Sequence, residues 1–114
     1  MAKTGKKRAQ KNSRRKGKVG ELEISHILKE RGYDAHRGRQ YNGADGSPDV
    51  VGLPGIHLEV KRVEKLNIVK AMEQSKSDAR DRELPVVVHR RNEQEWLLTM
   101  RFTDFLDMYE RSNG

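Results

Sequence analysis

The sequence contains no cysteine, which excludes disulfide bonds and thiolate zinc sites. It has only six aromatic residues, and none is spaced along a strand in the way that base-stacking sheets require. No apolar run approaches the ~18 residues that would span a membrane, and no secretory signal is found. We therefore expect a cytoplasmic protein with no membrane partner.

Positive charge is concentrated at the amino terminus. Residues 1–18 hold nine Lys or Arg and no acid, so the formal net charge of +7 leaves −2 for the other residues. We expect a basic, flexible arm over residues 1–18 and one globular domain over residues 19–114. Each phosphate that the arm contacts would release counterions, so nucleic acid is a suitable partner. A disordered, solubilising tail is the alternative.

The spacing of apolar residues predicts three helices and five strands. The helices are expected over 18–31, 67–80 and 103–111, and the strands over 33–38, 48–53, 56–62, 84–90 and 95–100. Gly32 would end the first helix, while Asn67 and Thr103 would cap the others. The order α-β-β-β-α-β-β-α predicts an α/β (α+β) single domain with a central mixed five-stranded sheet flanked by helices. The expected core residues are Ile24, Ile27, Leu28, Val50, Leu58, Val60, Val86, Val87, Val88, Trp96 and Leu98.

Charged residues interrupt the predicted hairpin "SPDVVGLPGIHLEVKR". Side chains two apart on a strand share a face, so His57, Glu59 and Lys61 would lie opposite the core-facing set. A two-residue turn would put Asp49 on the core face. A three-residue turn over 53–55, with Gly55 in the left-handed conformation, would put Asp49 opposite Glu59, and we predict this second register.

Two facing carboxylates repel each other unless a cation lies between them. A hard divalent ion such as Mg²⁺ suits Asp49 and Glu59 because it takes oxygen ligands and needs only one or two carboxylates. Lys61 would then orient a water molecule or steady a phosphate. The alternative is a surface hairpin with a cross-strand ladder of Glu and Lys.

Further polar groups are candidates for the same site. Glu21 lies at the edge of the buried stripe of the first helix, nearer its centre than Glu23, and could reach the end of the sheet. The alternative for Glu21 is a solvated helical side chain. His57 shares the face of Glu59 and could support the site or touch a substrate. Arg37 and Arg39 flank a Gly-rich loop suited to a nucleic-acid backbone.

The pattern as a whole resembles the PD-(D/E)xK nuclease superfamily. "SPD" leads to Asp49, and Glu59-x-Lys61 follows after a nine-residue gap. "RKGKVGELEISHILKERGYDAHR" resembles the opening of archaeal-type Holliday-junction resolvases, in which a basic Lys-Gly segment precedes a helix with a catalytic Glu. "LPVVVHR" and "EWLLT" are similar to the later strands of small phage or bacterial relatives, so the resemblance implies a restriction-endonuclease-like core and a bacterial or phage origin.

The resemblance also implies roles for the site residues. Asp49 and Glu59 would be metal ligands together with the backbone carbonyl of Val60, and Glu21 would bind metal directly or through water. Lys61 would position the attacking water, and Gln74 would support the site, with an exposed helical Gln as its alternative. The implied cofactor is Mg²⁺, which Mn²⁺ could replace, and the implied assembly is a homodimer that cleaves branched DNA.

One departure from the archaeal resolvases concerns their serine in the loop before Pro-Asp. Here that loop reads "GRQYNGADGS", so either Gln40 or Asn42 takes the role or the role is absent. The nucleic-acid-binding residues expected in total are Arg14, Arg15, Lys16, Lys18, Arg37, Arg39, Gln40 and Asn42.

The sequence thus predicts a Mg²⁺-dependent DNA endonuclease. The alternative function is a basic nucleic-acid-binding module without catalysis, which the arm alone would support. The acidic residues of the hairpin argue against the module, because carboxylates repel phosphate unless a metal intervenes.

Overall fold

The computed structural model of the chain describes residues 2–38 and 48–113, with side chains from residue 15 onward. The elements are α1 (Ala2–Glu30), β1 (His36–Arg37), β2 (Val50–Val51), β3 (Ile56–Arg62), α2 (Ile68–Asp78), β4 (Leu84–Arg90), β5 (Leu97–Met100) and α3 (Phe102–Asn113). Their order and the five-stranded mixed sheet confirm the predicted fold class. None of the described helices is both long enough and apolar enough to cross a membrane.

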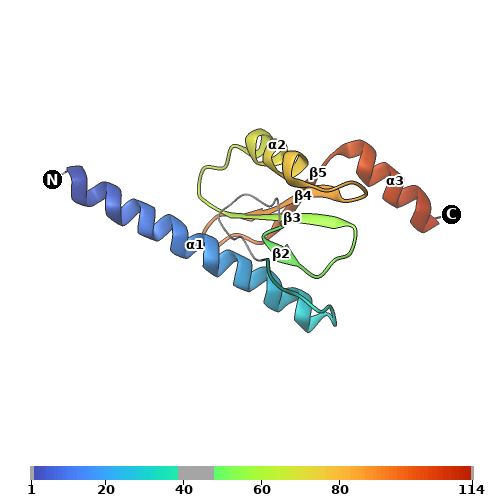
Figure 1. The fold of residues 1–114 in the computed structure, drawn as a ribbon, viewed down its shortest axis with the longest axis horizontal. Helices are drawn as coiled ribbons and strands as arrows, with labels where there is room; N and C mark the ends of the chain where they lie inside the picture. The colour runs from blue at the N-terminus through green and yellow to red at the C-terminus, as the bar shows by residue number, and fades with distance from the viewer. Residues whose placement is uncertain (1, 39–47, 114) are drawn as a thin grey trace.

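Helix α1 is longer than predicted. It begins at Ala2 and not near Lys18, because half of residues 1–18 are Lys or Arg, which favour helix, and the segment contains no proline. The amino-terminal half of the helix extends beyond the sheet (Figure 1). The end was predicted correctly: Gly32 has a φ of +92°, and its N–H donates to the carbonyl of Lys29. The division into an arm and a domain at residue 18 remains a prediction.

The five strands lie in the order β1-β2-β3-β4-β5. Only β3 and β4 are parallel; every other neighbouring pair is antiparallel. Val50 pairs with Leu58, which is the register predicted for the three-residue turn. The turn has the predicted geometry, since Gly55 has a φ of +84° and the N–H of Ile56 donates to the carbonyl of Leu53 over 3.0 Å. Extended by one residue, this register brings Asp49 beside Glu59.

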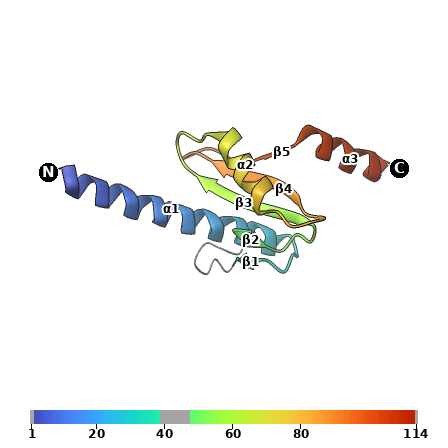
Figure 2. The ribbon, with the colours of Figure 1, turned by 45° about the horizontal axis from the view of Figure 1, so that its top comes forward.

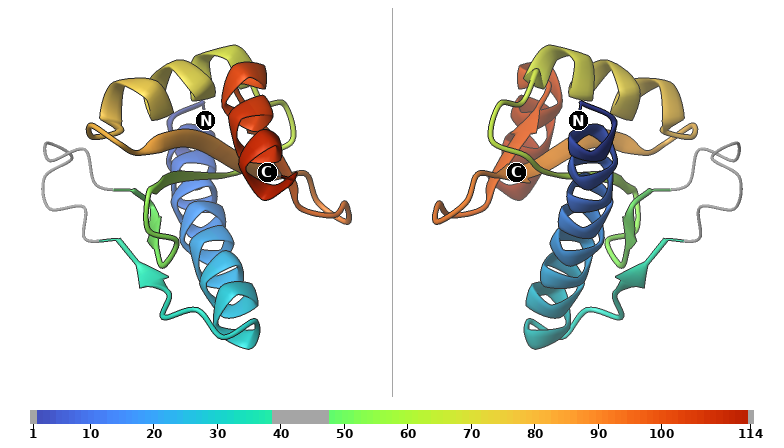
Figure 3. Two further views of the ribbon diagram at one scale, coloured as in Figure 1. Left: turned by 90° about the vertical axis from the view of Figure 1, so that its right-hand side faces the viewer. Right: turned by 90° about the vertical axis from the view of Figure 1, so that its left-hand side faces the viewer.

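Helices α1 and α2 lie on opposite sides of the sheet (Figures 1 and 3). Helix α1 packs on β1, β2 and β3, and α2 packs mainly on β4. The core between α1 and the sheet consists of Ile24, Val50, Leu58, Val60, Val86 and Val88, with Leu28 and Trp96 packed against it. Val87 is buried as well, on the strand that α2 covers.

Two predicted core residues are exposed. Ile27 lies at the margin of the buried stripe of α1, and Leu98 lies on β5, which α1 does not cover.

Of the two predicted helix caps, one is present and the other is not. The side chain of Asn67 accepts the N–H of Lys70 over 3.1 Å, as predicted, whereas Thr103 lies inside α3, which begins at Phe102. The Arg101 side chain donates to Asp104 in the first turn of that helix over 2.7 Å.

We expect Gly52→Ala to destabilise the protein by about 1–3 kcal/mol. Gly52 has a φ of +151°, and a Cβ there would lie 2.8 Å from the Cβ of Ala35. Urea unfolding monitored by circular dichroism would measure the change. Gly17→Ala is the matched control: a Cβ at Gly17 meets no atom within 4 Å, so alanine should stabilise the helix by about 0.5–1 kcal/mol. Equal stability of the Gly52→Ala variant and the wild type would contradict the expectation.

Candidate metal and phosphodiester site

Strand β3 places His57, Glu59 and Lys61 on the side of the sheet that α2 covers. His57 and Glu59 are both fully buried there, and Lys61 is half-buried at the end of the strand. Leu58 and Val60 point to the opposite side, into the core against α1. The alternation predicted from the sequence is therefore present, but it puts two ionisable groups inside the protein and not on its surface.

Asp49 is the second buried acid of the hairpin. Its backbone N–H donates to the carbonyl of Leu58, and its carboxylate accepts the N–H of Val60, both over 2.8 Å. Burial, followed by the charges of Glu59 and Glu21, raises the pKa of Asp49 to about 7 against the opposing effect of the Val60 hydrogen bond. Asp49 thus ionises with difficulty unless a positive charge is brought to it.

Helix α1 contributes Glu21 from the other side of the hairpin. Its Oε1 atom accepts two hydrogen bonds from Arg37, one from Nε and one from Nη2, each over 3.2 Å. Glu23, two residues later, points elsewhere: it accepts hydrogen bonds from Trp96 over 3.0 Å and from Arg90 over 3.1 Å. Of these two glutamates, only Glu21 faces Asp49.

The predicted site residues meet around one open cavity of about 280 Å³. The lining includes Glu21, Asp49, Glu59, Val60, Lys61 and Gln74. Gln74, from α2, accepts a hydrogen bond from the Lys61 ammonium group over 3.4 Å. A larger cavity of about 490 Å³ lies between the segment after β3 and the β4–β5 turn, but it contains none of the three acids and is a poor candidate for the same chemistry.

His57 differs from its predicted role. It was expected to be able to touch a substrate, but it is fully buried and its Nε2 lies 2.9 Å from Oε1 of Glu59. Burial lowers the pKa of His57, but the hydrogen bond and charge of Glu59, with the charges of Glu83 and Asp78, raise it more, so the net shift is upward. His57 therefore contacts the Glu59 carboxylate from within the protein and does not itself line the cavity.

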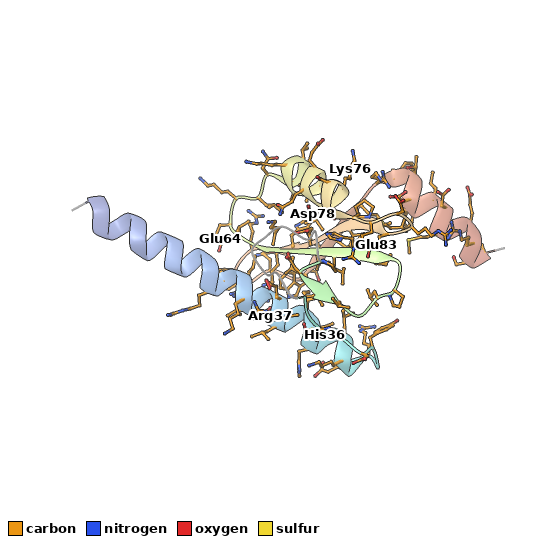
Figure 4. All side chains as sticks on the ribbon, viewed as in Figure 1. His36, Arg37, Glu64, Lys76, Asp78 and Glu83 are labelled. Atoms are coloured by element: carbon orange, nitrogen blue, oxygen red, sulfur yellow. The ribbon has the colours of Figure 1, made fainter. Side chains whose placement is uncertain are left out.

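Two acids of this buried group were missed in the sequence. Asp78 ends α2 and Glu83 directly precedes β4; both are labelled in Figure 4. Glu83 Oε1 lies 3.8 Å from His57 Nδ1, and Asp78 offers an oxygen within 4.8 Å of ligand atoms of His57 and Glu59. His57, Glu59 and Asp78 could therefore also hold a metal ion. No sequence spacing indicated this, because the three residues come together only when α2 packs on β3 and β4.

The predicted nucleic-acid-binding residues fall into three groups. Arg15 and Lys18 are exposed on α1 and Lys16 is half-buried there, one or two turns before Glu21. Arg37 is partly exposed on β1 and is bound to Glu21; His36 and Arg37 are labelled in Figure 4. The side chain of Arg14 lies outside the described residues, as do Arg39, Gln40 and Asn42.

The donor set around the cavity fits a hard divalent cation. Asp49 and Glu59 offer carboxylate oxygens, and the raised pKa of Asp49 reflects burial and nearby negative charge, both of which a bound cation would offset. In a strand, the N–H and C=O of one residue point to the same side, so the Val60 carbonyl faces the side on which Val60 donates to Asp49. Oxygen ligands of this kind favour Mg²⁺ or Mn²⁺ over softer metals.

We expect metal-free Asp49→Asn protein to be more stable than the wild type at pH 8, by on the order of 2–4 kcal/mol. The folded pKa of Asp49 is raised from 3.8 to about 7, so the wild type loses stability as the pH rises through this window. The advantage of the variant should shrink to less than half at pH 5. Unfolding in EDTA across this range would measure it, with the exposed Asp81→Asn as the control. A difference independent of pH would refute the assignment.

Comparisons with known proteins bear on the fold. No protein-family model matches the chain, and a search of curated proteins finds no match. Among solved structures, the chain is similar to Hjc, a Holliday junction resolvase from the archaeal hyperthermophile Archaeoglobus fulgidus. The TM-score is 0.56 and the identity 23%, over 75% of this chain and 72% of that one. The chain therefore shares its fold with this archaeal Holliday junction resolvase, which is the fold that the sequence resemblance predicted.

Proposed function

We propose that the protein is a metal-dependent DNA endonuclease that hydrolyses phosphodiester bonds, with a preference for branched DNA such as a four-way junction. The observation that carries the proposal is the cavity into which the hairpin brings Asp49, Glu59 and Lys61 and α1 brings Glu21. A protein that only binds nucleic acid has no need of three acids facing one another, because they repel phosphate.

Asp49, Glu59 and the Val60 carbonyl would hold Mg²⁺, or Mn²⁺ in its place, and Glu21 would bind it directly or through water. The ion would activate a water molecule and neutralise charge that develops on the phosphate. Lys61 positions the attacking water or steadies the phosphate, and its hydrogen bond to Gln74 restricts where its ammonium group can lie. His57 restrains the Glu59 carboxylate, which lines the cavity, through the 2.9 Å contact.

The DNA backbone would lie along α1. Arg15, Lys16 and Lys18 are on the helix that also provides Gly17 and Glu21 to the cavity, so phosphates bound by the basic residues would lead to the cleavage site. Symmetric cleavage of a junction needs two active sites, which favours a homodimer. A cytoplasmic protein of bacterial or phage origin would have the required access to DNA.

We expect end-labelled four-way junctions to be nicked symmetrically in Mg²⁺ and left intact in EDTA. Lys61→Ala should lower the cleavage rate at least about 100-fold, because a water-positioning group typically contributes this much. Lys65→Ala, at an exposed lysine nearby, is the matched control and should cleave at the wild-type rate. Cutting linear duplex equally well would retain the nuclease but reject the junction preference. Tight binding with no cutting in Mg²⁺ or Mn²⁺ would favour the non-catalytic binding module.

A second comparison separates catalysis from stability on α1. We expect Glu21→Gln to reduce cleavage strongly while the unfolding free energy changes little. Glu23→Gln should do the reverse, with a loss of about 1–2 kcal/mol in stability and near-normal cleavage, because Glu23 binds Arg90 and Trp96 away from the cavity. Parallel urea titrations and junction-cleavage rates would measure both. Loss of cleavage in both variants at equal stability would refute the distinct roles.

A further inference from the structure

A second group of ionisable side chains lies on the side of the sheet that α2 covers. Helix α2 lies over β3 and β4 (Figure 2), and it ends at Asp78. His57, near the start of β3, is fully buried on that side, and Glu83 directly precedes β4. We call His57, Asp78 and Glu83 the rear cluster; the two acids are labelled in Figure 4. None of the three lines the cavity that contains Asp49 and Lys61.

The two ring nitrogens of His57 face different acids. Nε2 lies 2.9 Å from Oε1 of Glu59, and Nδ1 lies 3.8 Å from Oε1 of Glu83. A carboxylate only accepts hydrogen bonds, so Nε2 carries the proton that is donated to Glu59. In the neutral ring, Nδ1 is then a lone pair inside the protein, and it has no hydrogen-bond partner. A buried polar atom without a partner is rare in folded proteins, and a bound ion is one of its ordinary explanations.

Acidic side chains surround His57 without basic side chains to balance them. Asp78 offers an oxygen within 4.8 Å of the ligand atoms of His57 and Glu59. Among the residues that the structure describes, no Lys or Arg forms an ion pair with Glu59, Asp78 or Glu83. Carboxylates gathered around a lone pair repel one another and the lone pair, and a divalent cation among them removes this repulsion.

We propose that the rear cluster is a second metal site, which binds a borderline divalent ion such as Zn²⁺ through Nδ1 of His57 and the carboxylates of Asp78 and Glu83. The 3.8 Å between Nδ1 and Oε1 of Glu83 leaves room for one ion bonded to both, because bonds from Zn²⁺ to nitrogen and oxygen are about 2.1 Å long. Glu59 lines the catalytic cavity and stays on Nε2, where it fixes the tautomer and the orientation of the ring. Zinc proteins use this carboxylate–histidine–metal arrangement widely.

The rear cluster differs from the catalytic cavity in its ligands and in its access to solvent. The acids of the cavity offer oxygen, which suits Mg²⁺, whereas an imidazole nitrogen suits Zn²⁺. Asp78 is half-buried and the side chain of Glu83 is 24% exposed, so an ion and its water ligands can reach the cluster from this side. Oε1 of Glu83 also accepts the backbone N–H of Arg80 over 2.7 Å, which holds that carboxylate in place before an ion arrives.

An ion in the rear cluster would connect three elements of the fold. It would tie the end of α2, at Asp78, to the start of β3 and to the residue before β4, and through His57 it would restrict the Glu59 carboxylate. The inference goes beyond the proposed function and does not depend on it. Zn²⁺ binding is measured without DNA and without cleavage, so either can fail alone.

The first test is calorimetric titration of Zn²⁺ into full-length Asp49→Asn protein that has been stripped of metal with EDTA, because this substitution impairs the catalytic site. We expect a single Zn²⁺ per chain. Adding Asp78→Asn and Glu83→Gln together should weaken its binding by more than about 100-fold, since even the groups that only orient metal ligands contribute about 10–100-fold. Asp81→Asn, at an exposed acid between the two in sequence, is the matched control and should leave binding unchanged. No binding by the Asp49→Asn protein, or equal binding after both acids are replaced, would overturn the proposal.

The second test identifies the nitrogen that binds the ion, and it uses the wild-type chain, so it does not depend on how well the variants fold. Of the four histidines, His57 alone is fully buried, so its ring proton exchanges slowly with water and marks its signals in nitrogen-15 NMR spectra. Adding Zn²⁺ should shift the Nδ1 resonance of His57, while Nε2 keeps its proton. Loss of the Nε2 proton would overturn the assignment of Nδ1 as the ligand, and unchanged His57 signals would overturn the site.

Discussion

The site depends on the pairing of β2 with β3, and in particular on the hydrogen bond that the Asp49 carboxylate accepts from the Val60 N–H. This bond anchors a buried carboxylate beside a second one, Glu59, where burial and the neighbouring charges disfavour the ionised form of Asp49. The raised pKa of Asp49 expresses that conflict. Placing two buried carboxylates side by side is electrostatically unfavourable, and a bound cation would make the arrangement favourable.

The remaining elements support this hairpin from two sides. On one side, α1 packs its apolar stripe on Leu58 and Val60. Glu21, at the edge of this stripe, thereby reaches the cavity. On the other side α2 covers Glu59 and His57 and supplies Gln74 to Lys61. The apolar packing of α1 and α2 on the sheet thus fixes the polar side chains that these helices bring to the cavity. In this way a small domain can keep ionisable groups in fixed positions. The contact between His57 and the Glu59 carboxylate also restricts where Glu59 can lie.

Several residues show why part of this could be predicted from the sequence. The turn over 53–55 needs a residue with positive φ, and only Gly55 suits that position, so the register and the approach of Asp49 to Glu59 followed from local chemistry. The alternation of β3 is equally local. Ile27 and Leu98 were assigned to the core wrongly because their burial depends on how far α1 and the sheet overlap. The amino-terminal extent of α1 differs from the prediction because a run of like charges favours a flexible arm, whereas Lys and Arg are also good helix formers.

The sequence by itself determined the order of elements, the faces of the strands, the turn and the acidic pair, because each depends on residues a few positions apart. Only the tertiary structure decided that Glu21 and not Glu23 faces the cavity, that His57 is buried against Glu59, and that Asp78 and Glu83 join it. These contacts connect residues that are distant in the chain, and they arise when helices dock on the sheet at particular angles. Docking angles depend on the packing of many side chains together, which no short stretch of sequence encodes.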